Sequence, residues 1–354
     1  VAAKPSELPE RKDWEFKYAD TLQYKLASGE PRIVIKIAGS EVVDTYTGVH
    51  LPEEWQREKR SKDNQRRIIT ILCGILLFIL FASGAITALI RWSRKNFATR
   101  EFVIFLLALF ILGLVQFLNS IPGLIAGFDT AQPFTNQLFI MLSLPLIGVL
   151  LLAAAIALII GFIKIWKPEQ NVETNLLTIL TGFSGGFLLA GIAALVSNLF
   201  GPSLKPLWAE YEALNNYIPF LAAGLNPIQG YIAGTTVFLL IFTAITRFTH
   251  NWTKKRVLFS ILIIFLILII NGLSLQTVPF WIISGLISGL VYLFIYIFII
   301  RYRLDLIPLI IAGSTILGIV KELVFNAYPA AIPGNILAIL LIAAIAVFWN
   351  RRLV

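Results

Sequence analysis

The chain has 354 residues, of which 58% are hydrophobic and 14% are charged, and its mean hydropathy is +0.82. Soluble domains have roughly 45 to 50% apolar and 25% charged residues, so this composition excludes an ordinary soluble protein. The net charge of +9 does not predict nucleic-acid binding, because the basic residues adjoin apolar runs, where cytoplasmic retention and lipid head groups account for them.

Residues 1–50 predict a small extracytoplasmic β module. Aromatic residues alternate with charged ones at the start of this segment, as in a half-buried strand: Trp14, Phe16 and Tyr18. A second strand is predicted over Arg32 to Ile37, with Glu41 to Thr47 returning as its hairpin partner. A module of about 50 residues is marginal alone, so we expect it to pack on the membrane domain, on a protein partner or on a preceding part of the protein. The start at Val1 agrees with a processed or cut N-terminus.

Residues 51–67 predict a charged helical linker, which continues into the first apolar segment with no Pro or Gly between Glu53 and Cys73. Pro52 suits the first position of a helix. Glu53 and Glu54 then lie in the first turn, where acidic side chains complement the helix dipole.

Residues 68–354 predict a polytopic transmembrane domain. A hydrocarbon core of about 30 Å takes roughly 17 to 25 helical residues to cross, and nine apolar runs meet or approach this length. The predicted spans are Ile68 to Ile90, Phe102 to Leu118, Leu138 to Ile165, Leu176 to Leu199, Ile228 to Ile245, Val257 to Ile270, Phe280 to Ile300, Leu306 to Val320 and Ile336 to Trp349. Prolines interrupt the approach to the fifth span, and three spans are short, so the count carries an uncertainty of one or two. The fold class is therefore an all-α polytopic membrane protein of about nine transmembrane helices with a small N-terminal antiparallel β module.

Basic residues predict which ends of the spans face the cytoplasm. One set of connections carries Arg91, Arg94, Lys95, Arg100, Lys164, Lys167, Arg247, Lys254, Lys255, Arg256, Arg301, Arg303, Arg351 and Arg352, whereas the opposite set carries Lys205 and Lys321. In a bacterial cytoplasmic (inner) membrane this places the C-terminus inside and, with nine spans, the N-terminal module outside. The linker is an exception, because its own basic residues would then lie outside. Either the span count differs by one, or a partner holds the linker there.

Polar residues near the end of the eighth span form a candidate site: Lys321, Glu322 and Asn326. Glu322 and Asn326 are one helical turn apart and would line a polar site, because ionisable groups in a membrane usually face a cavity or a partner. The alternative is a lysine that extends to the lipid interface beside a hydrated carboxylate. The amides of other spans are expected to hydrogen-bond between helices: Gln116, Asn119, Asn198, Asn226, Gln229 and Asn271.

No catalytic, cofactor-binding or metal-binding residue is predicted, and no cofactor is expected. The chain has one cysteine, Cys73, and two histidines, His50 and His250, and it contains neither a P-loop nor an HExxH pattern. Closely spaced glycines predict close contacts between helices instead: Gly182, Gly185, Gly186 and Gly191, and Gly285 and Gly289.

The run RIVIKIAGSEVVDTYTGVHLPEEWQREKR, residues 32–60, resembles the region ahead of the membrane domain in long bacterial members of the CPBP family, the CAAX protease and bacteriocin-processing intramembrane proteases. A looser resemblance covers FDTAQPF, residues 128–134. The resemblance implies an intramembrane protease that uses EExxxR, FxxxH and HxxxN-type motifs. In this chain the adjacent glutamates Glu53 and Glu54 precede the spans and have Arg57 three residues after the second one. No histidine lies within a span, so no catalytic residue carries over.

The sequence leaves three hypotheses for function. The first is a noncatalytic integral membrane protein that binds or scaffolds a protein partner at the N-terminal module, similar in framework to CPBP-like proteins. The second is a CPBP-type intramembrane protease whose catalytic part is absent from, or degenerate in, this chain. The third is a small-solute transporter, which a central cavity holding Glu322 with Asn326 and a facing polar residue would favour. All three place the chain in a lipid bilayer and none involves nucleic acid.

Overall fold

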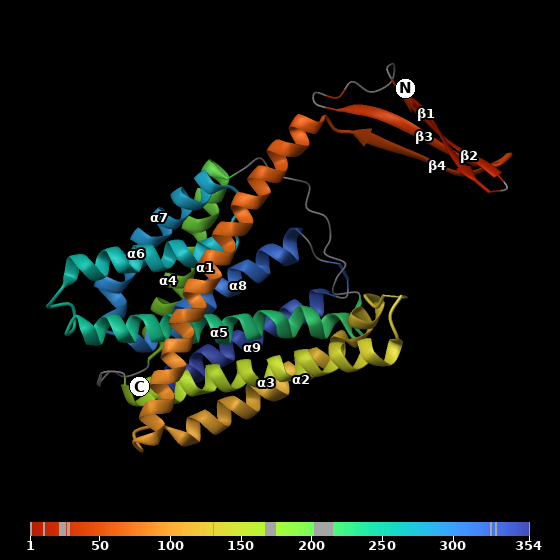
Figure 1. Ribbon diagram of the computed structural model, residues 1–354. Coiled ribbons are helices and arrows are strands. Elements are labelled where there is room, and N and C mark those ends of the chain that lie inside the picture. The colour runs from red at the N-terminus through yellow and green to blue at the C-terminus, as the bar shows by residue number, and fades with distance from the viewer. Residues whose placement is uncertain are drawn as a thin grey trace. The chain divides into compact units, whose positions relative to one another are not determined.

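A computed structural model describes residues 2–9, 11–20, 26, 29–129, 131–166, 175–201, 215–325, 328–329 and 331–353 (Figure 1). It divides into two compact units, Val1–Ile69 and Thr70–Val354, each of which is described by itself. The division falls inside the first helix.

The first unit contains a four-stranded antiparallel sheet with the strand order β1-β2-β3-β4. Its strands are β1 (Ala2–Leu8), β2 (Arg11–Ala19), β3 (Glu30–Ala38) and β4 (Glu41–His50). The sequence predicts the last three, but β1 is an additional strand. Its sequence AAKPSEL has no apolar alternation and contains Pro5, which an edge strand tolerates because one side of its backbone is unpaired.

The register places the aromatic residues of β2 opposite the isoleucines of β3. Trp14 pairs with Ile37 and Phe16 with Ile35. The rings of Trp14 and Phe16 stack with centroids 5.7 Å apart. Between β3 and β4, Gly39 has a φ of 62°, a left-handed conformation that glycine adopts without a steric cost. The period-two pattern therefore becomes one continuous aromatic and aliphatic face of the sheet.

Nine α-helices follow in the described part of the chain. They are α1 (Glu53–Ser93), α2 (Thr99–Ala126), α3 (Phe134–Trp166), α4 (Leu176–Phe200), α5 (Pro219–Phe248), α6 (Arg256–Gly272), α7 (Val278–Ile295), α8 (Ile307–Phe325) and α9 (Ala331–Leu353). A π-helical turn, Tyr296–Ile300, extends α7, and a 3-10 turn, Leu304–Leu306, precedes α8. Within the described residues, eight helices are long and apolar enough to cross a bilayer, and α6 with 17 residues is shorter.

The prolines near the fifth span do not break it. Helix α5 begins at Pro219, where the missing N–H has no helical acceptor to lose, and continues through Pro227. The expected interruption before Ile228 is therefore wrong. The fifth helix starts nine residues earlier than predicted, because Pro219 and Pro227, which are typical helix breakers, bound a mostly apolar segment that is nevertheless helical.

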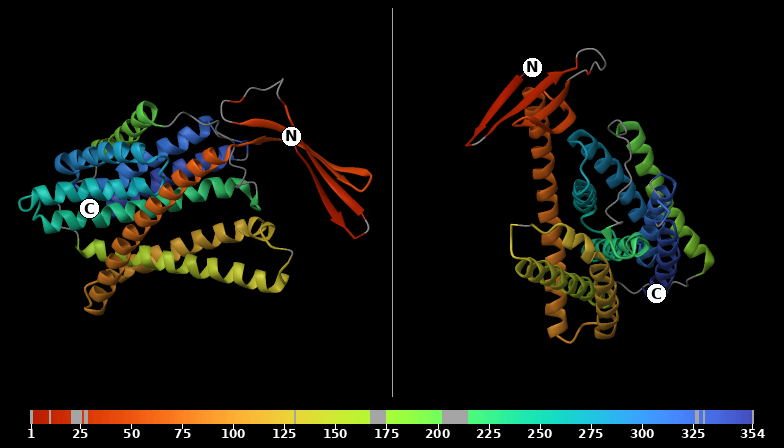
Figure 2. Two further views of the ribbon diagram at one scale, coloured as in Figure 1. Left: turned by 45° about the horizontal axis from the view of Figure 1, so that its top comes forward. Right: turned by 90° about the vertical axis from the view of Figure 1, so that its right-hand side faces the viewer.

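Helix α5 lies at the centre of the second unit, where α2, α3, α8 and α9 contact it. In its apolar 18-residue stretch, 61% of the residues are buried. Figure 2 shows α2 and α3 paired as a hairpin along one side of the bundle.

Glycines permit the closest crossing, between α4 and α8, where a Cβ on Gly186 would lie 2.1 Å from the carbonyl oxygen of Ile310. The predicted role of closely spaced glycines in helix contacts is confirmed here and at Gly285 and Gly289, which face α6. Gly191 is different, because nothing lies within 4 Å of its Cβ position.

Basic residues from the ends of α1 and α5 meet at one end of this unit. Arg91 and Arg247 line the same small hollow, although 156 positions separate them in the numbering, and the Ala98 amide donates to the Gly161 carbonyl close by. At Thr70, the other end of the α1 segment that belongs to this unit, the side-chain hydroxyl donates a 3.1 Å hydrogen bond to the Gly272 carbonyl.

Candidate solute-binding cavity

A cavity of about 970 Å³ lies among five helices of the second unit: α2, α3, α5, α8 and α9. Binding sites for small molecules typically have roughly 300 to 1,000 Å³, so this cavity has room for an organic solute with bound water. Its wall combines one carboxylate and several amides with aromatic and small side chains.

Helical spacing explains why these residues share one wall. On α8, the lining residues Thr315, Gly318, Ile319 and Glu322 follow the spacing i, i+3, i+4, i+7 of a single helix face. Helix α2 repeats this spacing with Gly113, Gln116, Phe117 and Ser120. Each helix thus carries a short polar or small-residue stripe on the face that it turns toward the others.

Amide side chains join α2 to α5 at the cavity wall. The Gln116 amide donates a 2.9 Å hydrogen bond to the Asn226 side-chain oxygen. Asn119 holds the backbone just before α5 from both sides, because its amide donates to the Ile218 carbonyl at 3.0 Å and its oxygen accepts from the Ile218 N–H at 2.7 Å. The prediction that these amides hydrogen-bond between elements is confirmed for Gln116, Asn119 and Asn226.

Two prolines also line the cavity, Pro145 on α3 and Pro227 on α5. A proline inside a helix cannot donate to the carbonyl four residues earlier, so each leaves one backbone acceptor without its helical partner. For Pro227 that carbonyl belongs to Ala223, which itself lines the cavity. In a membrane, such acceptors are tolerated where they face protein or a polar cavity.

The structure separates the three residues of the predicted polar cluster. Glu322 lines the cavity, whereas Lys321 is exposed and is not one of its lining residues. Asn326 lies outside the described residues. Within the described part of the chain, Glu322 is the one ionisable carboxylate of this wall, and no Lys, Arg or His side chain lines it.

One polar group at the wall lacks a hydrogen-bond partner within the described residues. The hydroxyl of Tyr328 is buried and has no partner in the described segments. A buried polar group without a partner costs free energy, so this hydroxyl favours a polar occupant of the cavity, either water or a solute. Asn335 on α9, which is only 4% exposed, adds an amide to the same wall.

Buried aromatic side chains continue along α5 from the cavity wall. Tyr231 forms part of the wall, is 1% exposed and donates its hydroxyl to the Pro308 carbonyl at 3.2 Å. Further along α5, Phe242 stacks on Tyr296 with ring centroids 5.4 Å apart, and Trp252 meets Tyr296 edge-on. The described lining residues include Asn216 before α5 and Tyr328 after α8, so the cavity reaches the connections at this end of the helices.

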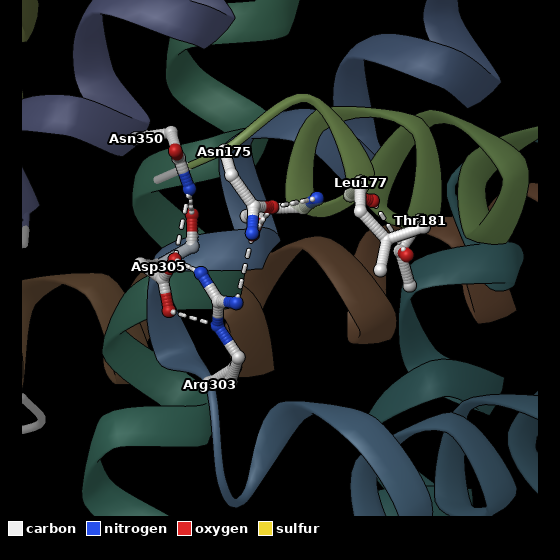
Figure 3. A network of polar contacts seen from close by, with 7 residues as sticks. Asn175, Leu177, Thr181, Arg303, Asp305 and Asn350 are labelled. Carbon is white, nitrogen blue, oxygen red and sulfur yellow. Dashed lines mark hydrogen bonds and ion pairs between the residues drawn. The ribbon is translucent and has the colours of Figure 1, made fainter. Parts of the chain in front are cut away.

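A polar network links α4, the turn before α8 and α9 (Figure 3). Asp305 is 4% exposed and forms an ion pair with Arg303 at 2.7 Å. The same guanidinium donates to the Thr178 hydroxyl at 2.9 Å, and the Asn350 amide donates to the Asp305 carboxylate at 3.0 Å. Asn175 caps α4 by accepting from the Thr178 N–H at 2.9 Å. The network fixes three helix ends but lies apart from the cavity lining.

Sequence reasoning missed two parts of this arrangement. Asn335 falls one residue before the predicted start of the ninth span, whereas α9 begins at Ala331 and carries it inside the bundle. Asp305 lies between two predicted spans in the sequence, but in the structure it is a buried residue of the 3-10 turn before α8. An available signal for Asn335 was its spacing of four residues from Ala331, which places both on one helix face.

No three His, Cys, Asp or Glu side chains gather into a metal-binding group anywhere in the described segments. Comparison of the chain with protein-family models, with curated proteins and with solved structures finds no match. The resemblance of residues 32–60 to the CPBP family therefore stays a prediction, and the cavity itself is the basis for a function.

Proposed function

We propose that this integral membrane protein binds a small polar solute in the cavity among α2, α3, α5, α8 and α9 and carries it across the membrane. The cavity is the observation that supports this function, because polar side chains from four helices line one space inside a bundle of apolar helices. Polar groups inside a membrane domain are costly and usually face a substrate path.

The position of the cavity also supports transport. Its described lining reaches the connections before α5 and after α8, and it includes the buried Tyr231 within the bundle. In many secondary transporters a site near the middle of the bundle is exposed alternately to the two sides, and discontinuous or proline-containing helices line it. Pro145 and Pro227 are such positions here.

A filled cavity tests this function. Gly230 lines the cavity, and nothing lies within 4 Å of its Cβ position, so Gly230→Trp places a large side chain in the cavity without a backbone clash. Gly148 on α3 is a matched control, because its Cβ position is equally open and it is not a lining residue. Both variants and the wild type would be reconstituted into liposomes. Uptake of radiolabelled amines, carboxylates, sugars and amides would then be measured.

We expect uptake of at least one solute class above protein-free liposomes, a loss of about tenfold or more in Gly230→Trp, and uptake near wild type in Gly148→Trp. Uptake equal to that of protein-free liposomes for the whole panel would contradict transport. Uptake that survives Gly230→Trp in a correctly folded protein would contradict the role of this cavity.

Binding of a protein partner by the first unit is a second candidate function. All ten residues of the edge strand β4 are exposed, including Val42, Val43 and Tyr46 at 60%, 60% and 46%. An exposed edge strand can pair with another chain. Deleting residues 1–50 should then abolish co-purification of a partner while solute uptake persists. Retention of the same partner without the module would contradict this candidate.

A further inference from the structure

We infer that the solute of this cavity is a neutral polyhydroxylated molecule, a sugar or a polyol, whose hydroxyl groups bind the amide side chains of the wall. This inference rests on the proposed function and adds the chemical class of the solute. The amides, the phenol of Tyr328 and the aromatic rings of the lining favour this class.

Amides are the most frequent polar side chains of the described cavity wall. Each amide carries N–H donors and an oxygen acceptor side by side. A hydroxyl group also donates and accepts, so two neighbouring hydroxyls of a sugar can bond to both ends of one amide. The hydroxyls of Ser120 and Thr315 add groups with the same dual character. The six amides of the described lining are Gln116, Asn119, Asn216, Asn226, Gln229 and Asn335.

The amide pair between α2 and α5 keeps bonding capacity after its own hydrogen bond is made. That bond, of 2.9 Å, joins the Gln116 nitrogen to the Asn226 oxygen. An amide has two N–H donors and an oxygen with two lone pairs, so the Gln116 oxygen and the Asn226 amino group are not used by this bond. The pair therefore presents an acceptor on α2 and donors on α5 at one place in the wall.

Tyr328 adds a hydroxyl and a ring to the same wall. Its hydroxyl is buried without a hydrogen-bond partner in the described segments, which is costly until another group bonds to it. A hydroxyl of the solute satisfies it as donor or as acceptor. The rings of Phe117 and Tyr328 offer faces with negative charge density, on which the C–H groups of a sugar ring pack.

The balance of charges favours a neutral solute. A charged solute inside a membrane domain needs an opposite charge, because an unpaired buried charge is strongly unfavourable. The described lining contains no Lys, Arg or His side chain that would pair with an anion. Glu322 lines the cavity but has an interaction within the protein, so it is not a free partner for a cation. A neutral solute needs no such partner.

Sugars that share a ring but differ in charge test the class of solute. Glucose, galactose and mannose would each be compared with the corresponding amino sugar and uronate, and myo-inositol with cyclohexanol, a similar ring with a single hydroxyl. Binding to the purified full chain in lipid nanodiscs would be measured by equilibrium dialysis and by the shift in the thermal unfolding midpoint. Gly230→Trp corrects for the general stabilisation that concentrated sugars give to any folded protein.

We expect at least one neutral sugar or myo-inositol to bind. Its charged derivatives, or cyclohexanol in the case of myo-inositol, should bind at least about tenfold more weakly, because they bring an unpaired charge or leave the amides without partners. Gly230→Trp should abolish this binding, whereas Gly148→Trp should keep it.

Variants of single polar groups assign the binding to the wall. Gln229→Leu should weaken binding of the neutral solute about tenfold, because an amide is lost at similar side-chain volume. Asn198→Leu is the matched control, since Asn198 is an exposed amide of α4 outside the described lining. Tyr328→Phe should weaken binding several-fold without lowering the unfolding midpoint of the solute-free protein, because the hydroxyl has no partner to lose.

Three results would overturn the inference: a charged derivative that binds as tightly as its neutral parent, cyclohexanol that binds as tightly as myo-inositol, or binding unchanged in both Gln229→Leu and Tyr328→Phe. A charged probe that binds the wild type but not Gly230→Trp, in place of the neutral sugars, would overturn the neutral class and leave the solute-binding cavity in place. Failure of every hydroxylated probe to bind would also overturn the class, and uptake of the amines, carboxylates and amides would then decide separately whether the cavity carries another solute.

Discussion

Individual polar residues have two roles in this membrane domain. Asn119 and Asp305 are buried and fully engaged with neighbouring groups, so they hold helix ends together. Asn335 is equally buried and lines the cavity, and Glu322 is an exposed residue of the same lining. The first two are structural, whereas the last two belong to the cavity wall.

The buried ion pair at Asp305 gives a prediction at this scale. Asp305→Asn would leave the Arg303 guanidinium, whose side chain is 22% exposed, without its anionic partner. Breaking a buried pair from one side costs about 3 to 5 kcal/mol, and the partial exposure of Arg303 reduces this to about 2 to 3 kcal/mol. The change is measurable as a lower midpoint of thermal unfolding in detergent.

Asp63→Asn is the control for this experiment, because Asp63 pairs with Arg66 at 3.4 Å on an exposed helix surface. Exposed pairs contribute about 0 to 1 kcal/mol, so its midpoint should stay close to wild type. Equal shifts for the two variants would show that the Asp305 network adds no more than a surface pair.

Whole elements are placed by small residues more than by large ones. Helices α4 and α8 cross where Gly186 meets the backbone of α8, at Gly313 and at the Ile310 carbonyl. In a bilayer, helices associate through close contact, since lipid tails are as apolar as leucine side chains. The glycines therefore set which helices become neighbours, and with them which polar stripes face the cavity.

Gly186→Leu should separate α4 from α8. The Cβ atom would lie 2.1 Å from the Ile310 carbonyl oxygen, and backbone atoms cannot move aside as a flexible side chain can. Overpacking of this kind costs about 1 to 3 kcal/mol or more, so the folded yield and the unfolding midpoint should both fall. Gly191→Leu on the same helix should leave both near wild type, because nothing lies within 4 Å of its Cβ position. A stable Gly186→Leu protein with a wild-type midpoint would contradict the close crossing.

At the scale of the whole molecule, basic residues lie together at one end of the second unit, where Arg91 and Arg247 line the same hollow. We propose that this end faces the cytoplasm, because basic connections are retained there. The connections before α5 and after α8 would then face outward, and the solute would enter from that side. The N-terminal module would then lie outside, because α1 spans the membrane between the module and Arg91.

Cysteine labelling tests the sidedness. In a Cys73→Ala background, single cysteines would replace Arg94, Lys254, Ser274, His50 and Arg351, and intact cells would be treated with a membrane-impermeant maleimide. We expect labelling at Ser274 and His50 and protection at Arg94, Lys254 and Arg351 until the cells are lysed. Labelling of His50 and Arg351 from the same side would overturn nine crossings and place the module in the cytoplasm.

The sequence by itself determined the helices and most of the sheet, because both depend on local periodicity. Apolar runs of sufficient length must be helical in a bilayer, where every backbone polar group needs an internal partner, and alternation in β2 and β3 places their apolar side chains on one face. The same local rule misplaced the start of α5 and left out β1, where polar residues and a proline conceal the pattern.

Only the tertiary structure decided the cavity. Gln116, Asn226, Glu322 and Asn335 lie on four helices, far apart in the chain, and each alone is a single polar residue in an apolar segment. A lone amide or carboxylate is compatible with a helix contact, a lipid interface or a ligand site. Their facing one another depends on which helices the glycine contacts bring together and on how each helix is rotated, and these are properties of the packed bundle that hydropathy does not contain.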